Sequence, residues 1–287
     1  MDFTTALQCA NLSQEIYRAE FSSTNSSEKA AFTSQVLPKA SSYLLQDTGT
    51  DTQFSILEDL ETGQTTIVFR GSENDKDWET NLRVSTREQS WQKKAEKAAE
   101  KAAKKEFRKE MKEVAEAVVE EEALVYPKEY GKPSRPVRMH QGFIDAYLSV
   151  RDRVHEHVQS SASHQYRITG HSLGGAIATL CAVDLQYNFD GKEGRTDPKI
   201  SSLEVYTFGS PRVGNGAFSD SYNQRVSNTW RIVNGWDAVV GLPAPWQGYR
   251  HVEKTVKLAR KFTWKIVTGS FNDHKISSYI SALGKQL

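Results

Sequence analysis

The sequence predicts an α/β protein with a largely parallel central sheet and helices on both faces of that sheet. From residue 141 onward, short apolar runs typical of strands alternate with longer segments typical of helices. This order favours a parallel sheet, because parallel strands need crossover connections. The chain has 287 residues, of which 38% are hydrophobic, enough for one large globular domain. We therefore expect residues 1–287 to form a single domain.

Four segments precede that alternation. Residues 4–20 and 28–37 carry loosely periodic apolar residues and are predicted to be helices that flank the sheet. Residues 54–60 and 65–70 are strand-like, and the turn composition of the residues between them predicts a hairpin. This hairpin delivers the chain to Ser72.

Residues 88–137 are predicted to form a helical insertion within the domain. Its central part, residues 92–123, holds nine Lys or Arg and nine Glu but no Gly or Pro, which favours one continuous helix. Positive charge gathers in the first half and negative charge in the second, opposite to the arrangement that the helix dipole favours. A single apolar stripe runs along this helix at helical spacing: Phe107, Met111, Val114 and Val118.

The stripe and the basic half of this helix have two interpretations. In the first, they contact an anionic or lipid surface, and the insertion acts as an enlarged lid or cap arm. In the second, the helix is solvated and docks its stripe on its own domain or on a second subunit. The stripe is narrower than the apolar face of most interfacial helices, which keeps the second interpretation open.

Five elements are predicted after the insertion: a helix over 143–158, a strand over 166–169, an apolar helix over 175–187, and strands over 203–208 and 230–233. The first of these strands and the helix after it flank Gly-His-Ser-Leu-Gly at residues 170–174. A G-x-S-x-G run between strand and helix is typical of a strained turn that exposes the serine hydroxyl. Ser172 is therefore the candidate nucleophile, and the alternative is a glycine-rich structural turn.

The acid and the histidine that activate such a serine follow it in the chain. His251 and His274 are the only histidines after Ser172. His251 lies in a strand-like run, whereas His274 lies in a polar loop that enters a C-terminal helix, where a general base has more freedom. Asp237 follows closely on the strand over 230–233, so it is the best acid. We favour His274 over His251; either could instead be a hydrogen-bonded surface histidine.

A serine that attacks esters also needs hydrogen-bond donors for the oxyanion of the tetrahedral intermediate. The backbone N–H of Leu173, which follows the nucleophile, is one candidate. The amide or hydroxyl of Ser72, just after an earlier strand, is the other. Alternatively, Ser72 lies in a plain turn at the end of a strand and has no catalytic role.

Together these residues resemble the class 3 lipases, a fungal-lipase-like branch of the α/β-hydrolases. The matching pieces stand in the family's order and cover roughly residues 54–280: Phe69-Arg-Gly-Ser with Trp78, the eight residues from His140 to Tyr147, Gly170 to Gly175, Thr207 to Asn215, Arg231-Ile-Val-Asn with Asp237 and Leu242-Pro243, Tyr249-x-His251, and Asp273-His274. The resemblance implies an α/β-hydrolase fold and a serine carboxylic-ester hydrolase. It implies Ser172 as nucleophile, Asp237 as acid and His274 as base. It also implies an oxyanion hole made by Ser72 and Leu173, and a structural role for His251.

The sequence departs from the family's pattern in three places. Asn81 stands where the family often has Asp, and the proline common after the acid is missing. Neither change removes a predicted catalytic group. The larger departure is the insertion between Asn81 and His140, which adjoins the region where relatives carry a lid.

The leading functional hypothesis is hydrolysis of acyl esters through an acyl-enzyme, without metal or cofactor. Acylglycerol lipase comes first. Phospholipase, galactolipid acyl hydrolase and esterase on soluble esters share the same machinery. From another class, a catalytically silent scaffold could recruit partners through the charged helix; a complete triad argues against that role.

The remaining features concern partners and compartment. A net charge of +1 does not indicate nucleic-acid binding. Cys9 and Cys181 lie far apart in the sequence, without the spacing of a disulfide framework or a zinc site. The sequence carries no signal for an oligomeric state, and no apolar run long enough to cross a membrane. No signal peptide is visible, so a cytoplasmic protein is expected, with peripheral membrane or lipid-droplet contact through the insertion. The alternative is a secreted protein, if the sequence is a mature form.

Overall fold

The structure is a computed structural model. It describes residues 1–21, 30–71, 137–189, 199–252, 254–258 and 272–287. The predicted helix over 92–123, with Phe107, Met111, Val114 and Val118, lies outside these residues, as does most of the predicted insertion over 88–137. Those features stay predictions. In the described part of the chain, no helix is long and apolar enough to span a membrane.

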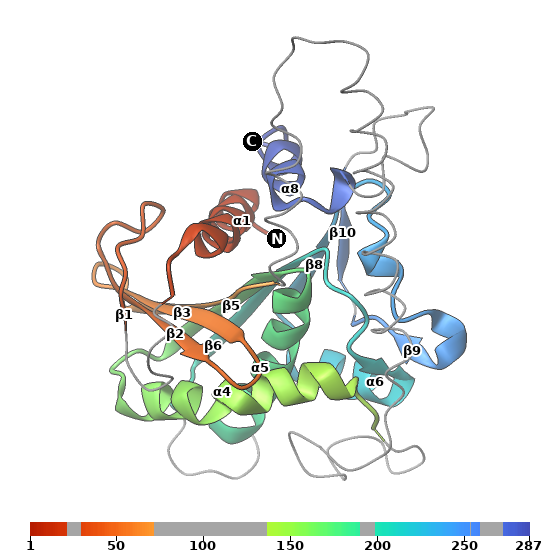
Figure 1. Ribbon diagram of the computed structural model, residues 1–287, viewed down its shortest axis with the longest axis horizontal. Coiled ribbons are helices and arrows are strands. Elements are labelled where there is room, and N and C mark those ends of the chain that lie inside the picture. Colours follow the sequence, from red (N-terminus) through yellow and green to blue (C-terminus); the bar gives the residue numbers. More distant parts are fainter. Residues whose placement is uncertain (22–29, 72–136, 190–198, 253, 259–271) are drawn as a thin grey trace.

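A mixed sheet forms the centre of the molecule (Figure 1). Among the described residues its strands lie in the order β1 (Ala30–Ala31), β2 (Ala40–Asp47), β3 (Thr52–Asp59), β4 (Gln64–Phe69), β5 (Gln165–His171), β6 (Ser202–Phe208), β8 (Thr229–Val233) and β10 (Thr255–Lys257). The first four strands pair antiparallel. From β4 to β10 every pairing is parallel. The prediction of a mostly parallel sheet is therefore confirmed.

Helices cover both faces of the sheet, as predicted. On one face lie α1 (Phe3–Arg18) and α8 (Ile276–Leu283); on the other lie α4 (Gln141–Ser160), α5 (Leu173–Phe189) and α6 (Gly216–Arg225) (Figure 1). A small pair of strands, β7 (Gly214–Asn215) and β9 (Tyr249–Arg250), and two 3-10 turns, η2 (Val239–Gly241) and η3 (Pro245–Gln247), complete the described elements. Together they form the layered architecture of an α/β-hydrolase.

The predicted elements and the observed ones differ mainly near the N-terminus. The hairpin is confirmed as β3 and β4, and Gly63 in its turn has a φ of 69°. The prediction of a helix over 28–37 is wrong: Ala30–Ala31 pairs with β2, and no helix follows. The hydroxyl of Ser34 accepts the N–H groups of Val36 and Leu37, which gives the backbone a turn in place of a helix. The strand β2 was not predicted.

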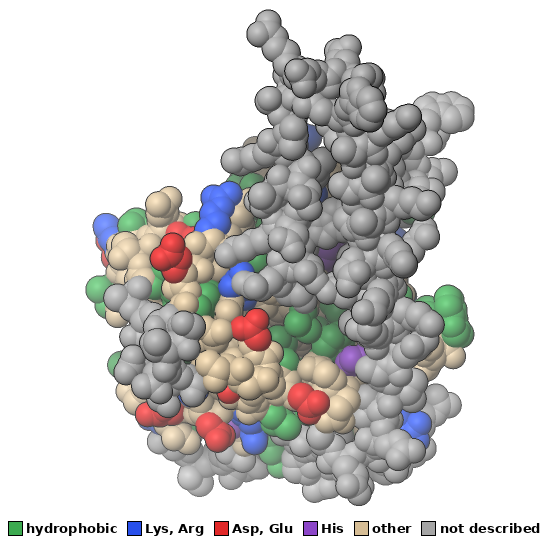
Figure 2. Space-filling model, in the orientation of Figure 1, with side chains coloured by type: hydrophobic (Ala, Val, Ile, Leu, Met, Phe, Trp, Pro, Cys, Tyr) green, Lys and Arg blue, Asp and Glu red, His purple; other side chains and the backbone are tan. Residues whose placement is uncertain are grey.

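The described surface shows no bias toward one sign of charge in the view of Figure 2. There, Lys and Arg side chains lie interspersed with Asp and Glu. This agrees with the near-neutral composition of the chain. A local gathering of cations would therefore stand out.

Candidate active site

Ser172 sits on a sharp turn between β5 and α5. Its φ of 57° lies in the left-handed region, which residues other than glycine rarely adopt. The turn is tight, because a Cβ built at Gly170 would lie 2.3 Å from the carbonyl oxygen of Gly174. The N–H of Ser172 donates to the carbonyl of Phe208 at 2.9 Å, which fixes the turn to β6. This is the strained strand-to-helix geometry that exposes a serine hydroxyl.

The structure brings Ser172, His274 and Asp237 together from three distant segments. The Nε2 atom of His274 lies 2.9 Å from the Oγ atom of Ser172. Its Nδ1 atom lies 2.8 Å from the Oδ2 atom of Asp237. A carboxylate only accepts, so Nδ1 carries the hydrogen and Nε2 is free to accept the proton of the serine.

Asp237 is held by two further donors. Its side chain has 0% exposure, and a buried carboxylate needs hydrogen bonds to offset its lost hydration. The N–H of Val239 donates to Oδ1 at 2.9 Å, and the hydroxyl of Tyr279 donates to Oδ2 at 2.5 Å. Burial and the neighbouring carboxylate raise the pKa of Tyr279 well above its ordinary value, so this phenol stays protonated and donates.

His171 supports the histidine from behind, and sequence reasoning missed it. It is fully buried, and its ring lies 4.6 Å from the ring of His274, centroid to centroid. Its Nε2–H donates to the backbone carbonyl of His274 at 2.6 Å, so its Nδ1 accepts from the hydroxyl of Tyr17 at 2.9 Å. In the sequence, only the place of His171 next to Ser172 could have indicated this contact. Nothing in the sequence around Tyr17 indicated its contact with His171.

His251 takes a different position from His274. Its Nε2–H donates to the carbonyl of Val240 at 2.7 Å, in the turn that follows Asp237. Burial, helped by the charge of Arg231, lowers the pKa of His251 to about 3. The imidazole is therefore neutral and anchors the loop that carries Asp237, whereas His274 is the histidine that reaches Ser172.

Of the two predicted oxyanion donors, the structure describes only Leu173. Leu173 is the first residue of α5, and the first N–H groups of a helix have no acceptor within it. Ser72 lies outside the described residues. The chain before it leaves β4 beside the turn, because Phe69 pairs with Gly170 in the parallel register. The oxyanion roles of both residues stay predictions.

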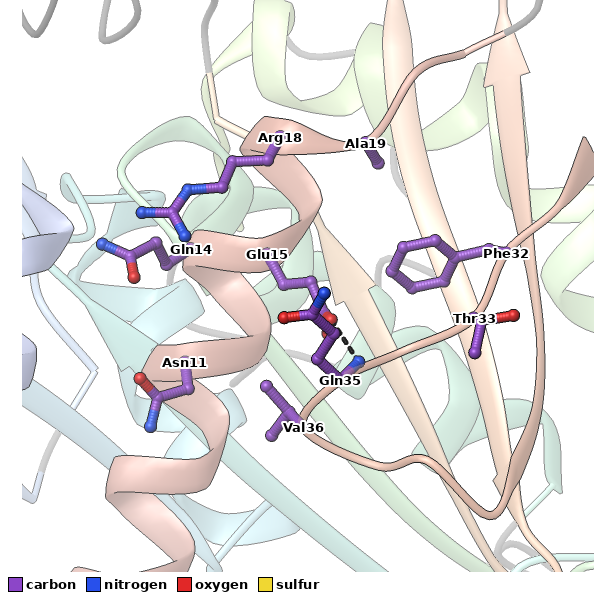
Figure 3. Close-up of a pocket in the computed structure, with 9 residues that line it drawn as sticks. All are labelled: Asn11, Gln14, Glu15, Arg18, Ala19, Phe32, Thr33, Gln35 and Val36. Carbon is purple, nitrogen blue, oxygen red and sulfur yellow. Dashed lines mark hydrogen bonds between the residues drawn. The ribbon is translucent and has the colours of Figure 1, made fainter.

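One described cavity, of about 410 Å³, lies between α1 and residues 32–36 (Figure 3). Its walls are mostly polar, and Glu15 within it accepts the N–H of Gln35. Its described lining includes no serine, cysteine or histidine, so it lacks the groups that nucleophilic ester chemistry needs. Among the described residues, no three His, Cys, Asp or Glu side chains could hold a metal ion.

A family model described as Lipase (class 3) matches residues 66–246, more than half of the chain. The chain belongs to the class 3 lipase family. A lipase of Rhizomucor miehei is 37% identical over 123 residues, which cover 42% of this chain and 32% of that protein. A secreted mono- and diacylglycerol lipase of Fusarium solani is 35% identical over 117 residues, which cover 39% of this chain and 32% of that protein. The matches thus span about a third of the length of these relatives.

Solved structures agree with the fold. A triacylglycerol lipase described as having a serine protease triad at its catalytic centre superposes with a TM-score of 0.59 at 23% sequence identity. The match covers 89% of this chain and 80% of that one. At this identity the likeness establishes the α/β-hydrolase architecture of the class 3 lipase.

The prediction of a cytoplasmic protein is wrong. Relatives from Fusarium solani, Malassezia restricta and Malassezia globosa are described as secreted lipases, whereas the prediction depended on the first residues of the sequence alone. The cysteines do not argue for a reducing compartment either. Cys9 and Cys181 are free and buried, and burial raises the pKa of Cys9 to about 12, which leaves its thiol unreactive.

Proposed function

We propose that this class 3 lipase hydrolyses carboxylic esters of acylglycerols through an acyl-enzyme on Ser172. The observation that carries the proposal is the pair of contacts made by His274, 2.9 Å to the Ser172 hydroxyl and 2.8 Å to the Asp237 carboxylate. Both distances suit proton transfer and orientation by hydrogen bonds. The triacylglycerol lipase of the same fold, with its serine protease triad, supports the same roles.

In the acylation step, Oγ of Ser172 attacks the ester carbonyl carbon while Nε2 of His274 takes its proton. The tetrahedral oxyanion accepts a hydrogen bond from the N–H of Leu173, and Ser72 is the proposed second donor. The C–O bond to the alcohol then breaks, and the alcohol oxygen takes the proton from His274. The acyl group remains on Ser172.

In the deacylation step, His274 removes a proton from a water molecule, and the resulting nucleophile attacks the acyl carbon. The bond to Oγ breaks, Oγ recovers the proton and the fatty acid leaves. Asp237 stays ionised and stabilises the imidazolium of His274 in both steps. Its hydrogen bond from Tyr279 holds it in position without taking part in proton transfer.

Acylglycerols are the proposed substrates, since the relatives are described as mono- and diacylglycerol lipases. Initial rates on p-nitrophenyl esters from C2 to C16, below and above the solubility limit, test this proposal. We expect turnover to rise above that limit for long chains, and Ser172→Ala to lower it by at least about a thousandfold. Turnover that persists in Ser172→Ala contradicts the mechanism. Turnover confined to short soluble esters contradicts the substrate class.

We also propose that residues 88–137 form the lid or cap arm of this single domain and meet the lipid surface. The support is the charge and apolar pattern of residues 92–123. Removal of residues 92–123 is expected to lower activity on micellar esters and to spare activity on monomeric ones. An equal change on both kinds of substrate would count against the proposal.

A further inference from the structure

A second described cavity, of about 520 Å³, lies beside β8, β9 and β10. Four cationic side chains line it, Arg212, Arg231, Arg250 and Lys254, together with the neutral imidazole of His251. Cations and anions are interspersed on the surface seen in Figure 2, so this gathering of one sign is local. The cavity of Figure 3 differs, because the carboxylate of Glu15 lies in its wall beside Arg18.

Arg231 is the central group of this cavity. It is only 7% exposed, and its Nη1 atom is buried without a hydrogen-bond partner in the described residues. Its Nη2 atom donates to the hydroxyl of Thr255, and its Nε atom lies 3.4 Å from the carbonyl of Val252. Burial, helped by the charge of Arg212, lowers the pKa of Arg231 to about 10, so the group still carries its charge at neutral pH. A buried donor of this kind is costly unless something pairs with it.

The acceptors around Arg212 and Arg231 are neutral. Arg212 donates to the carbonyls of Gly241 and Pro243, which satisfy its N–H groups without balancing its charge. Two other partly buried arginines of the described structure have carboxylate partners: Arg151 pairs with Asp184 and Arg167 with Glu204. Among the described residues no such pair is formed by Arg212 or Arg231. The described part of the cavity therefore has two positive charges without a carboxylate partner.

The rim of the cavity adds two exposed cations. Arg250 pairs with Asp220. Lys254 donates to the carbonyl of Ser227, and its φ of 63° holds it in the left-handed region that non-glycine residues seldom occupy. Such backbone strain often marks a residue whose position serves a ligand. Trp246, in η3 next to the cavity wall, is 88% exposed, and tryptophan favours the boundary between lipid and water.

We propose that this cavity binds a phosphate group, presented by a lipid headgroup or by a soluble phosphate ester. Guanidinium groups recognise phosphate oxygens through paired, charge-assisted hydrogen bonds, and three of them, on Arg212, Arg231 and Arg250, line this cavity. The cavity volume lies in the range of small-molecule sites and exceeds the size of a bare phosphate ion. The proposal does not depend on ester hydrolysis.

Binding is tested with the Ser172→Ala protein, which keeps lipid intact during the measurement. Isothermal titration calorimetry with glycerol 3-phosphate and with inorganic phosphate forms the soluble arm. Co-sedimentation with phosphatidylcholine vesicles, with and without phosphatidic acid, forms the lipid arm. The variants are Lys254→Gln, Arg231→Gln and the control Lys285→Gln, which removes one exposed positive charge outside the cavity lining. Thermal unfolding checks that each variant is folded.

We expect Lys254→Gln and Arg231→Gln to weaken binding by at least about tenfold, and Lys285→Gln to leave it unchanged. If Arg231→Gln does not fold, the exposed Lys254→Gln carries the test. If Trp246→Ala also weakens binding to the vesicles, a lipid headgroup supplies the phosphate. If binding is confined to the soluble arm, a free phosphate ester supplies it. Absence of binding in both arms overturns the proposal. So does equal weakening by Lys285→Gln, which would mean general charge attraction.

Discussion

The side chains next to the serine are held by residues that move no proton themselves. Tyr279 from α8 and the N–H of Val239 both donate to Asp237. His171 holds the backbone of His274, and Tyr17 from α1 holds His171. Positioning of this kind matters because a displacement of about 1 Å at a reacting group can cost about a hundredfold in rate. The helices on one face of the sheet thus hold the side chains of the proposed proton path.

Gly209 tests how little room this arrangement leaves. Its φ is 60°, and a Cβ there would lie 2.6 Å from Oδ2 of Asp237 and 3.0 Å from Nδ1 of His274. We expect Gly209→Ala to lower the free energy of unfolding by about 1–3 kcal/mol. It should also lower kcat by about a hundredfold, because the acid and the base must separate. Urea unfolding and initial rates measure the two effects.

Gly63→Ala is the matched control for this substitution. Gly63 has a φ of 69°, but nothing lies within 4 Å of its Cβ position. This variant should lose about 1–2 kcal/mol of stability through backbone strain alone and keep its kcat. An equal loss of kcat in both variants would mean that the effect of Gly209→Ala is not local to Asp237 and His274.

The sequence predicted which side chains meet at the site, but not what holds them. Ser172 could be found because the glycine spacing around it signals the turn, and Asp237 and His274 because chain order restricts the choices. Tyr17 and Tyr279 lie in α1 and α8, whose side chains reach the site only after those helices pack on the sheet. No local pattern encodes such a contact, so it could not be predicted.

At the scale of elements, α5 determines where the turn points. Most of its side chains are buried, since the helix lies between the sheet and α4. The long apolar run over 175–187 and the amphipathic pattern over 143–158 are strong local signals, which is why both helices were predicted. Residues 28–37 and β2 lack such patterns. The structure of residues 30–37 and of β2 follows from pairing between successive strands and from the side chain of Ser34.

Asp184 joins α5 to α4. Its fully buried carboxylate accepts from Tyr147, Arg151 and His155, all on α4. Burial alone would raise the pKa of Asp184, but the hydrogen bonds from His155 and Arg151 outweigh burial and lower it. A lowered pKa contributes stability above the unfolded value of about 3.9, and that contribution is lost as pH falls through the folded value.

We expect Asp184→Asn to lower the free energy of unfolding at neutral pH by about 3 kcal/mol or more, because Arg151 keeps a charge that has lost its carboxylate. As the pH falls below about 4, the variant should also lose less stability than the wild type. Urea unfolding across this range measures both effects. Asp152→Asn, at an exposed position on α4, is the control, and matching acid sensitivity in the two variants would contradict the role of Asp184.

On the scale of the whole molecule, the parallel half of the sheet gathers the chemistry at one edge. Ser172 follows β5 and the loop of Asp237 follows β8, so both lie at the carboxyl ends of parallel strands. The sequence could predict this edge, since parallel order follows from alternating strands and helices. It could not predict the cavity near Arg231. That cavity depends on β9, β10 and the 3-10 turns, which are too short to have a periodic pattern.

The titration of His251 makes the stability of the whole molecule depend on pH. Its pKa is lowered to about 3 by burial and by Arg231, whereas an unfolded histidine titrates near 6.5. Between these values the unfolded chain binds a proton that the folded chain does not, so stability rises with pH across this window. The contribution is complete above about pH 6.5 and is lost as pH falls toward 3.

We expect His251→Gln to flatten the fall in stability between about pH 6 and pH 4, where the wild type should lose roughly 1.4 kcal/mol per pH unit from this group. Urea unfolding at several pH values gives the slope. His164→Gln removes an exposed histidine on the surface and should leave the slope unchanged. If instead His251→Gln keeps the wild-type slope, His251 does not stay neutral in the folded protein, and the loop after Asp237 must be held by its other contact, Arg212.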